Sequence, residues 1–190
     1  MSDVQGLIID AAERRFADYG YNKTTMAEIS ADCDMCVGNL YRHFKNKEAL
    51  AVGSMQRMLD NKLAAGVSAA KGEADASDAL SAFLFARLRL AHAHYAETRH
   101  LFDMMQLVNI KHRDLLLNYE DKVIDALAAI IQRGIEQGRF QACDARQMAY
   151  DIHQATLRYN SPINLKNNAL KTLEADLSRL LALLLRGLAC

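Results

Sequence analysis

The chain has 190 residues, of which 51% are apolar, and its 23 basic and 23 acidic side chains give a formal net charge of zero. This composition is typical of a globular protein, and it excludes a disordered chain or one that binds nucleic acid through its overall charge. The presence of only one proline favours long helices over many short strands.

The first 65 residues contain the start and stop signals of four helices. Apolar residues recur at a 3.6-residue period from Val4 onward, and Gly20 follows in the usual position of a helix-terminating glycine. Thr25 and Glu28 have the spacing of a capping box, which begins a second helix. We expect helices at residues 3–19, 26–33, 37–44 and 47–65.

Small and polar residues at 66–77 mark the expected boundary between a domain at 1–65 and another at 66–190. Beyond it the apolar pattern stays helical, and Pro162 and the asparagines after it break the chain before the last helix. The sequence therefore predicts an all-α fold of about nine helices. The later ones are expected at residues 78–100, 101–108, 113–137, 145–159 and 168–188.

The two short helices are joined by a tight turn, which is the arrangement of a helix-turn-helix. The second would present Asn39, whose amide can read a base edge, and Val37, which can touch a thymine methyl. Gly38 costs roughly 1 kcal/mol within a helix, and a close backbone approach to DNA or to the preceding helix would explain it. The alternative is a small helical bundle with a solvated basic patch. Side chains suited to DNA phosphates are Tyr41, Arg42, His43 and Lys47.

A set of landmarks occurs in a fixed order along the stretch that begins ERRFADYG and ends KEAL, residues 13–50. The order resembles the N-terminal domain of the TetR family of bacterial transcriptional repressors, and the match is close over residues 5–52. Farther on, the chain matches in helix layout and in GIEQGRFQACD, which resembles the family's turn before its last two helices. The landmarks are Phe16, Gly20 and Tyr21, Thr25 to Ile29, Gly38, Leu40 and Tyr41, His43 and Phe44, and Lys47 to Leu50.

The resemblance implies a DNA-binding domain followed by a helical domain that dimerises and binds an inducer. The protein would then be a ligand-released repressor that binds a palindromic double-stranded operator as a homodimer. Thr25, Tyr41 and Lys47 would hold phosphates, and Cys36 would cap the recognition helix. The residues that would face bases or nearby phosphates are Val37, Asn39 and either Arg42 or His43.

The turn departs from the family's pattern of small residues. Asp34 replaces a glycine, and aspartate tolerates a left-handed backbone conformation there. Cys36 is a weaker cap than the usual serine. Val37 stands at a position that is often basic, so one contact to DNA is lost.

The last helix carries leucines at alternating steps of three and four residues, and further leucines widen this stripe. A helix that is apolar on more than one side needs more than one neighbour. A two-fold four-helix seam built from the last two helices would supply it, and the alternative is a fully buried core helix. The expected interface residues are Leu170, Leu173, Leu177, Leu180 and Leu184.

Aromatic and methionine side chains in the second domain are typical of a cavity for a small apolar or aromatic effector. Residue by residue they also fit an ordinary core. The candidate polar groups of the cavity are His92, Tyr95, Tyr119 and His153. The whole candidate set is Phe85, Leu88, His92, Tyr95, Phe102, Met105, Tyr119, Met148, Ile152 and His153.

Cys33 and Cys36 form a C-x-x-C across the turn. A zinc knuckle needs four ligands, and no second pair is near in the sequence, so no metal and no cofactor is expected. Two small residues in a turn are the plain interpretation. A thiol redox switch is an alternative, because a thiol at a helix N-terminus ionises readily. A haem- or metal-responsive regulator of the same fold is another.

Other classes of protein lack support in the sequence. No nucleophile elbow, phosphate loop or dinucleotide motif occurs, so no enzymatic activity is expected. The most apolar run, residues 180–185, is far shorter than the roughly 20 residues of a membrane span. Together with the acidic N-terminus, this leads us to expect no membrane association and a cytoplasmic location.

Overall fold

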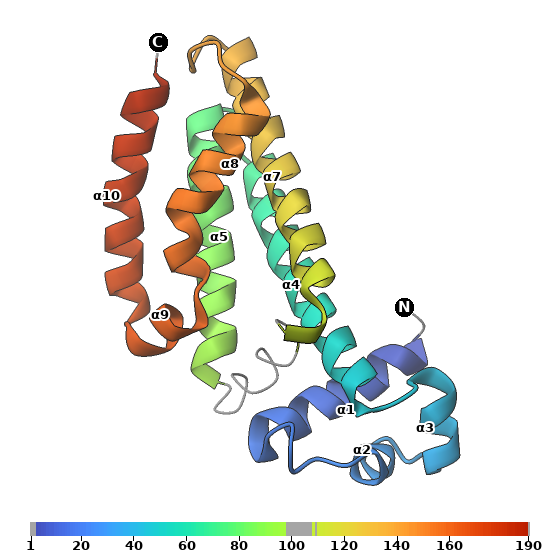
Figure 1. The fold of residues 1–190 in the computed structure, drawn as a ribbon. Helices are drawn as coiled ribbons and strands as arrows, with labels where there is room; N and C mark the ends of the chain where they lie inside the picture. The colour runs from blue at the N-terminus through green and yellow to red at the C-terminus, as the bar shows by residue number, and fades with distance from the viewer. Residues whose placement is uncertain (1–2, 98–107, 109, 190) are drawn as a thin grey trace. The chain divides into compact units, whose positions relative to one another are not determined.

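The computed structural model describes residues 3–97, 108 and 110–189. Within these residues it has nine α-helices and one 3₁₀ helix, η1, and it has no β-strand beyond a single bridge between Phe140 and Ala189 (Figure 1). The all-α prediction is confirmed. The helices are α1 (Asp3–Tyr19), α2 (Met26–Asp32), α3 (Val37–His43), α4 (Lys47–Lys71), α5 (Ala76–Glu97), α7 (Arg113–Glu136), α8 (Ala145–Thr156), η1 (Leu157–Asn160), α9 (Pro162–Asn167) and α10 (Leu170–Leu188).

Most predicted helix boundaries agree with these to within a few residues. The helix expected at 101–108 lies, except for its last residue, outside the described residues, as does the end of the one expected at 78–100. The fourth helix is longer than predicted, because α4 continues through Gly66 to Lys71. Pro162 does not simply break the chain, since it occupies the first turn of α9, where its missing N–H is no loss.

The chain divides into two compact units, unit 1 with residues 1–59 and 97–116 and unit 2 with residues 60–96 and 117–190. Helix α4 contributes to both. The segment expected to mark the domain boundary, residues 66–77, is therefore partly helical, and its Gly66 has a packing role. A Cβ on Gly66 would lie 2.9 Å from Arg87 Cγ and 2.9 Å from the Phe83 ring, so glycine allows these α5 side chains to lie against α4.

Unit 1 consists of α1, α2, α3 and the first half of α4 around a small apolar core. Arg57 on α4 holds α1 through Asp10 Oδ1 at 2.6 Å and Glu13 Oε2 at 2.5 Å. Arg15 on α1 holds α2 through Asp32 Oδ2 at 2.6 Å. These pairs fix the frame that carries α3. The fully buried side chains at its centre include Ile8, Ile9, Ala12, Ile29, Leu40, Leu50 and Met55.

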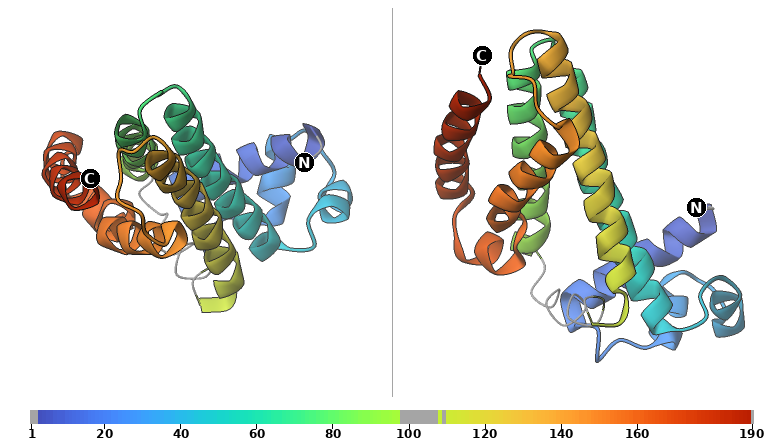
Figure 2. Two further views of the ribbon diagram at one scale, coloured as in Figure 1. Left: turned by 90° about the horizontal axis from the view of Figure 1, so that it is seen from above. Right: turned by 45° about the horizontal axis from the view of Figure 1, so that its top comes forward.

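Unit 2 is a bundle of the second half of α4 with α5, α7, α8 and α10. Figures 1 and 2 show α4, α5 and α7 running side by side, with α8 crossing in front of α5 and α10 at the edge of the bundle. Helix α10 is joined to α5 by the pair Arg89–Glu174 and to η1 by Arg158–Asp176. The apolar core includes Leu80, Phe83, Leu88, Val123, Leu127, Ile131, Ile152, Leu173, Leu177 and Leu181.

Candidate nucleic-acid interface and buried polar cluster

The start of α2 is fixed by the predicted capping box. The Thr25 hydroxyl accepts from the Glu28 amide at 3.3 Å, and Glu28 Oε2 accepts from the Thr25 amide at 2.8 Å. The Thr25 hydroxyl also donates to Glu28, and this bond holds the pKa of the Glu28 carboxyl below its usual value. Thr25 itself is exposed, as a phosphate contact requires.

The turn between α2 and α3 has the left-handed residue that the sequence predicts. Asp34 has a φ of 52°, and the Met35 amide donates back to Ser30 O at 2.9 Å. Cys36 occupies the N-cap position of α3, but its thiol makes no capping hydrogen bond. The predicted cap is therefore present by position only, in keeping with the poor hydrogen-bonding capacity of a thiol.

All residues of helix α3 except Leu40 are exposed or half-buried. Leu40 is fully buried and anchors the helix, whereas Val37 is 37% exposed and Tyr41 is 50% exposed. Arg42 is exposed, and Asn39 and His43 are half-buried. The helix contains no acidic residue, so the face is suited to a polyanion.

Gly38 lies exposed in the first turn of α3. A Cβ built there would meet no described atom within 4 Å, so no contact with the preceding helix accounts for the glycine. Within the described residues, close packing against the preceding helix therefore does not explain Gly38. The other explanation, a close approach of DNA to the backbone, stays a prediction.

Lys47 has an intramolecular role that the sequence did not indicate. Its Nζ donates to Tyr21 O at 2.7 Å and Thr24 O at 2.9 Å, and it lies 4.4 Å from the centre of the Tyr21 ring. Partial burial lowers the pKa of this ammonium. Lys47 therefore ties the first turn of α4 to the loop that leads into α2, and its role toward phosphates stays a prediction.

The two cysteines of the C-x-x-C differ in environment. Cys33 is buried, and burial raises the pKa of its thiol, which disfavours the reactive thiolate. Cys36 is exposed, and both are free thiols. Among the described residues, no group of three or more His, Cys, Asp or Glu side chains could hold a metal ion.

The residues predicted to line an effector cavity do not all come together. Leu88, Tyr95, Tyr119, Ile152 and His153 are buried within unit 2. Phe85, His92 and Met148 are half-buried, and His92 Nε2 lies 3.1 Å from Asn168 O. Phe102 and Met105 lie outside the described residues. Tyr119 and His153 share their surroundings with two cations that sequence reasoning missed.

These cations are Lys62 on α4 and Arg87 on α5, which are 4% and 1% exposed. Arg87 Nη2 donates to the Tyr119 hydroxyl at 3.2 Å, and Lys62 Nζ lies 5.6 Å from the centre of the Tyr119 ring. Burial, reinforced by Arg87, lowers the pKa of Lys62 to about 7. Burial, Arg87 and Lys62 together lower the pKa of His153 to about 4. We refer to Lys62, Arg87, Tyr119 and His153 as the buried polar cluster.

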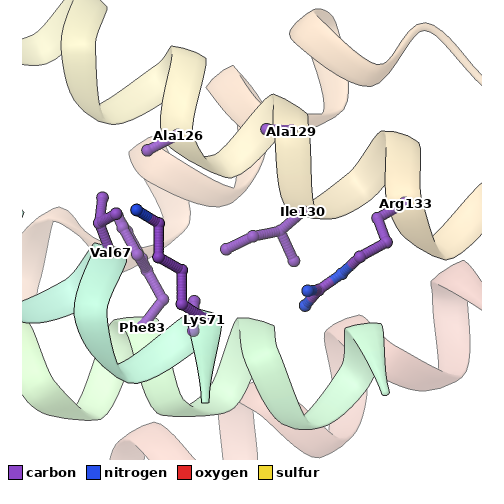
Figure 3. Close-up of a pocket in the computed structure, with 8 residues that line it drawn as sticks. Val67, Lys71, Phe83, Ala126, Ala129, Ile130 and Arg133 are labelled. Carbon is purple, nitrogen blue, oxygen red and sulfur yellow. The ribbon is translucent and has the colours of Figure 1, made fainter. Parts of the chain in front are cut away.

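A separate pocket of about 210 Å³ lies between α4, α5 and α7 (Figure 3). Phe83 forms part of its wall, and Figure 3 shows Arg133 reaching from α7 toward the other two helices. The Arg133 Nε and Nη2 atoms are buried without a hydrogen-bond partner. None of its lining residues belongs to the candidate effector set predicted from the sequence. They are Val67, Ala70, Lys71, Phe83, Ala126, Ala129, Ile130 and Arg133.

The leucines of α10 divide between two environments. Leu173 and Leu177, which were expected in a dimer interface, are fully buried in the core of their own chain. Leu170, Leu180 and Leu184 are half-buried. The most exposed leucine of the helix is Leu183, at 62%, which was not in the predicted interface set. The helix has two apolar sides, and one of them faces outward.

None of the helices in the described parts of the chain combines the length and apolarity of a membrane span.

Comparison with known proteins assigns both parts of the chain. Residues 8–52 match the profile of bacterial regulatory proteins of the tetR family, and residues 76–181 match that of the tetracyclin repressor-like C-terminal domain. The HTH-type transcriptional regulator YhgD of Bacillus subtilis is 23% identical over 148 residues, which is 78% of each chain.

Solved structures share the fold over almost the whole length. A transcriptional regulator from Cytophaga hutchinsonii superposes with a TM-score of 0.71 at 24% identity, covering 97% of this chain and 98% of the other. The fatty acid degradation regulator FadR from Bacillus halodurans gives a TM-score of 0.68 at 19% identity, covering 97% and 96%.

Proposed function

The chain belongs to the tetR family of bacterial regulatory proteins, and on that premise we propose that it is a ligand-released repressor that binds a palindromic operator as a homodimer. It is a transcriptional regulator with a DNA-binding helix-turn-helix, in which α3 is the recognition helix. The proposal comprises the recognition role of α3, repression, homodimerisation and release by an effector.

The observation that carries the proposal is the face of α3. It is exposed, free of acids and open at Gly38, while Leu40 anchors the opposite face in the core. Such a helix can enter the major groove with its first turn close to the base edges. Asn39 would read a base edge, and Arg42 would contact a phosphate.

Dimerisation rests on the outward face of α10. Leu183 is 62% exposed, and the half-buried Leu180 and Leu184 flank it. One exposed leucine beside two half-buried ones leaves apolar surface in water, which a second copy of the same helix would cover. Two copies would place two recognition helices about 34–36 Å apart, the spacing of successive major grooves on one side of DNA.

Release by a ligand is proposed as a population shift. A small apolar or aromatic effector bound in unit 2 would favour a spacing of the two recognition helices that no longer fits the half-sites. The effector must then bind the released state more tightly than the DNA-bound state, because a ligand of equal affinity for both shifts nothing.

A mobility-shift titration tests the DNA part. The probe is duplex DNA from upstream of the protein's own coding region, with scrambled duplex as competitor. We expect specific retention that weakens with salt. Arg42→Ala should reduce the slope of log affinity against log salt by about one, and Arg186→Ala, in unit 2, should leave it unchanged. Failure to retain any duplex at low salt would contradict the proposal.

Sedimentation equilibrium tests the dimer. Leu183→Glu places a charge on the exposed face of α10 and should yield folded monomers, because Leu183 contributes little to the core of its own chain. Ile110→Glu is the control, since Ile110 is 80% exposed but lies in unit 1. A monomeric wild-type protein rules out the homodimer, and a dimeric Leu183→Glu variant rules out this face of α10.

A further inference from the structure

The buried polar cluster contains more hydrogen-bond donors than the described residues satisfy. Arg87 Nε and Nη1 and both ring nitrogens of His153 are buried and have no hydrogen-bond partner within residues 3–97, 108 and 110–189. A buried polar atom without a partner costs free energy, and most such atoms in folded proteins are paired. Four unpaired atoms on two neighbouring side chains are therefore unusual in a protein interior.

Among the described residues, no ion pair joins Lys62 or Arg87 to a carboxylate. The carboxylate of Asp60, two residues before Lys62 on α4, pairs with Lys122 at 3.7 Å and, after burial, adds to the rise in the pKa of Tyr119. The phenols of Tyr95 and Tyr119 stay neutral, since burial raises the pKa of each. Burying cations without anions is strongly unfavourable, and arrangements of this kind are typical of binding or catalytic sites.

From the unpaired donors and the missing countercharge, we propose that the buried polar cluster binds the carboxylate of a small organic acid, which is the effector of this regulator. Arg87 and Lys62 would donate to the carboxylate oxygens, and Tyr119 would orient Arg87. The proposal rests on the ligand-released repressor described above and names the chemical class of its ligand.

The charge of the cluster fits a monoanion. Besides the guanidinium of Arg87, the cluster holds His153, which is neutral with a pKa of about 4, and Lys62, which is close to half-protonated at neutral pH with a pKa of about 7. One carboxylate therefore offsets one of the two cations and favours the protonated form of Lys62.

The surroundings of the cluster fit an apolar or aromatic body. The Arg87 guanidinium lies 5.2 Å from the centre of the Phe83 ring, and burial, with Tyr119 nearby, raises the pKa of Tyr95. These rings would pack against the remainder of the acid while its carboxylate pairs with the cations.

Calorimetric titration of the full-length protein, without DNA, tests the inference. The probes are phenylacetate, hydrocinnamate, octanoate and decanoate, each with its neutral primary amide, which keeps the body and removes the charge. At least one carboxylate should bind about tenfold or more tightly than its amide, because only the carboxylate neutralises the cations. If every carboxylate binds no better than its amide, the inference is wrong.

Variants locate the binding. Lys62→Met and Arg87→Met retain most of the apolar stem and remove the charge, and each should abolish the preference for the carboxylate. The control is Lys171→Met, which removes a lysine charge from the exposed side of α10 and should leave the preference unchanged. Circular dichroism confirms that each variant is folded. If both cluster variants still bind the carboxylate more tightly than its amide, the carboxylate binds elsewhere and the inference is wrong.

The pH dependence gives an independent signature. In the described part of the chain, Arg87, Tyr119 and His153 lie around Lys62, and the raised pKa of Tyr119 and the lowered pKa of His153 keep both neutral between pH 7 and pH 9. Carboxylate binding needs protonated Lys62, so its affinity should fall above pH 7, by up to about tenfold per pH unit. The wild type should take up part of a proton on binding at pH 7 and a larger part at higher pH, and Lys62→Met should take up none.

The two proposals can fail separately. Mobility shift without any acid tests the repressor, and calorimetry without DNA tests the carboxylate site. If the acid binds at the cluster but does not release the DNA, the site stands and its role as effector site is wrong. If no operator is retained, the calorimetric result still decides whether the cluster binds a carboxylate.

Discussion

Gly38 is the residue at which sequence and structure together say most about DNA binding. A Cβ there would have open space in the described structure, so Gly38→Ala should fold normally and stabilise α3 by about 1 kcal/mol. The added methyl would still stand between the backbone and a base edge. We therefore expect greater resistance to urea and weaker operator binding in the same variant.

The control for this experiment is Ser68→Ala. Ser68 is also an exposed residue within a helix, but it lies on the part of α4 that belongs to unit 2, and alanine there has the better helix propensity. It should raise stability without affecting DNA affinity. If both variants bind the operator as tightly as the wild type, no close backbone approach occurs at Gly38.

Residue-scale features were predictable where they depend on the local chain. The capping box of Thr25 and Glu28 and the left-handed Asp34 depend on neighbours within a few positions, and both are confirmed. Lys62 and Arg87 were not predictable, because long cationic side chains are almost always exposed and only tertiary packing buries these two. The predicted DNA contacts remain predictions.

At the scale of elements, the turn after α7 depends on Gly134. The Phe140 ring lies directly on this glycine, and a Cβ there would overlap the ring. Gly134→Ala should therefore lower the free energy of unfolding by roughly 1–3 kcal/mol, despite the better helix propensity of alanine. Urea denaturation monitored by circular dichroism measures the change.

A double variant checks the cause of that loss. In Phe140→Leu the smaller side chain leaves room for a methyl group, so adding Gly134→Ala should cost much less than it does in the wild type. Purely additive effects would mean that the two residues do not interact and that another contact is responsible.

Helix periodicity predicted most elements, but it did not predict the full length of α4 or which leucines of α10 are buried. Residues 66–71 look like a linker by composition, yet their alanines favour a helix and Gly66 is needed for the approach of α5. In α10 the sequence could not divide the leucines between the core and the outside. Periodicity shows which residues share a face, but it does not show whether the neighbour is in the same chain.

At the scale of the whole molecule, His153 should make stability depend on pH in the acid range. Its pKa is about 4 in the folded protein and about 6.5 when unfolded, so between these values the unfolded chain binds more protons. The stability contributed by neutral His153 is complete above pH 6.5 and is lost as pH falls toward 4. The loss is on the order of 3 kcal/mol.

Urea midpoints measured from pH 4 to pH 7 would detect this loss. The comparison is with His153→Leu, which keeps a side chain of similar size and cannot be protonated. The curve of the variant should be flatter than that of the wild type. Parallel curves would show that His153 has the same proton affinity in the folded and unfolded states.

The unbalanced charge of Arg87 and Lys62 also bears on how long the protein survives in a cell. A chain that holds unpaired cations in its interior unfolds more readily, and proteases act mainly on the transiently open form. An acid that neutralises the cluster would lower the open population by mass action. The abundance of the regulator would then rise and fall with its own signal, so the same chemistry would set both its activity and its lifetime.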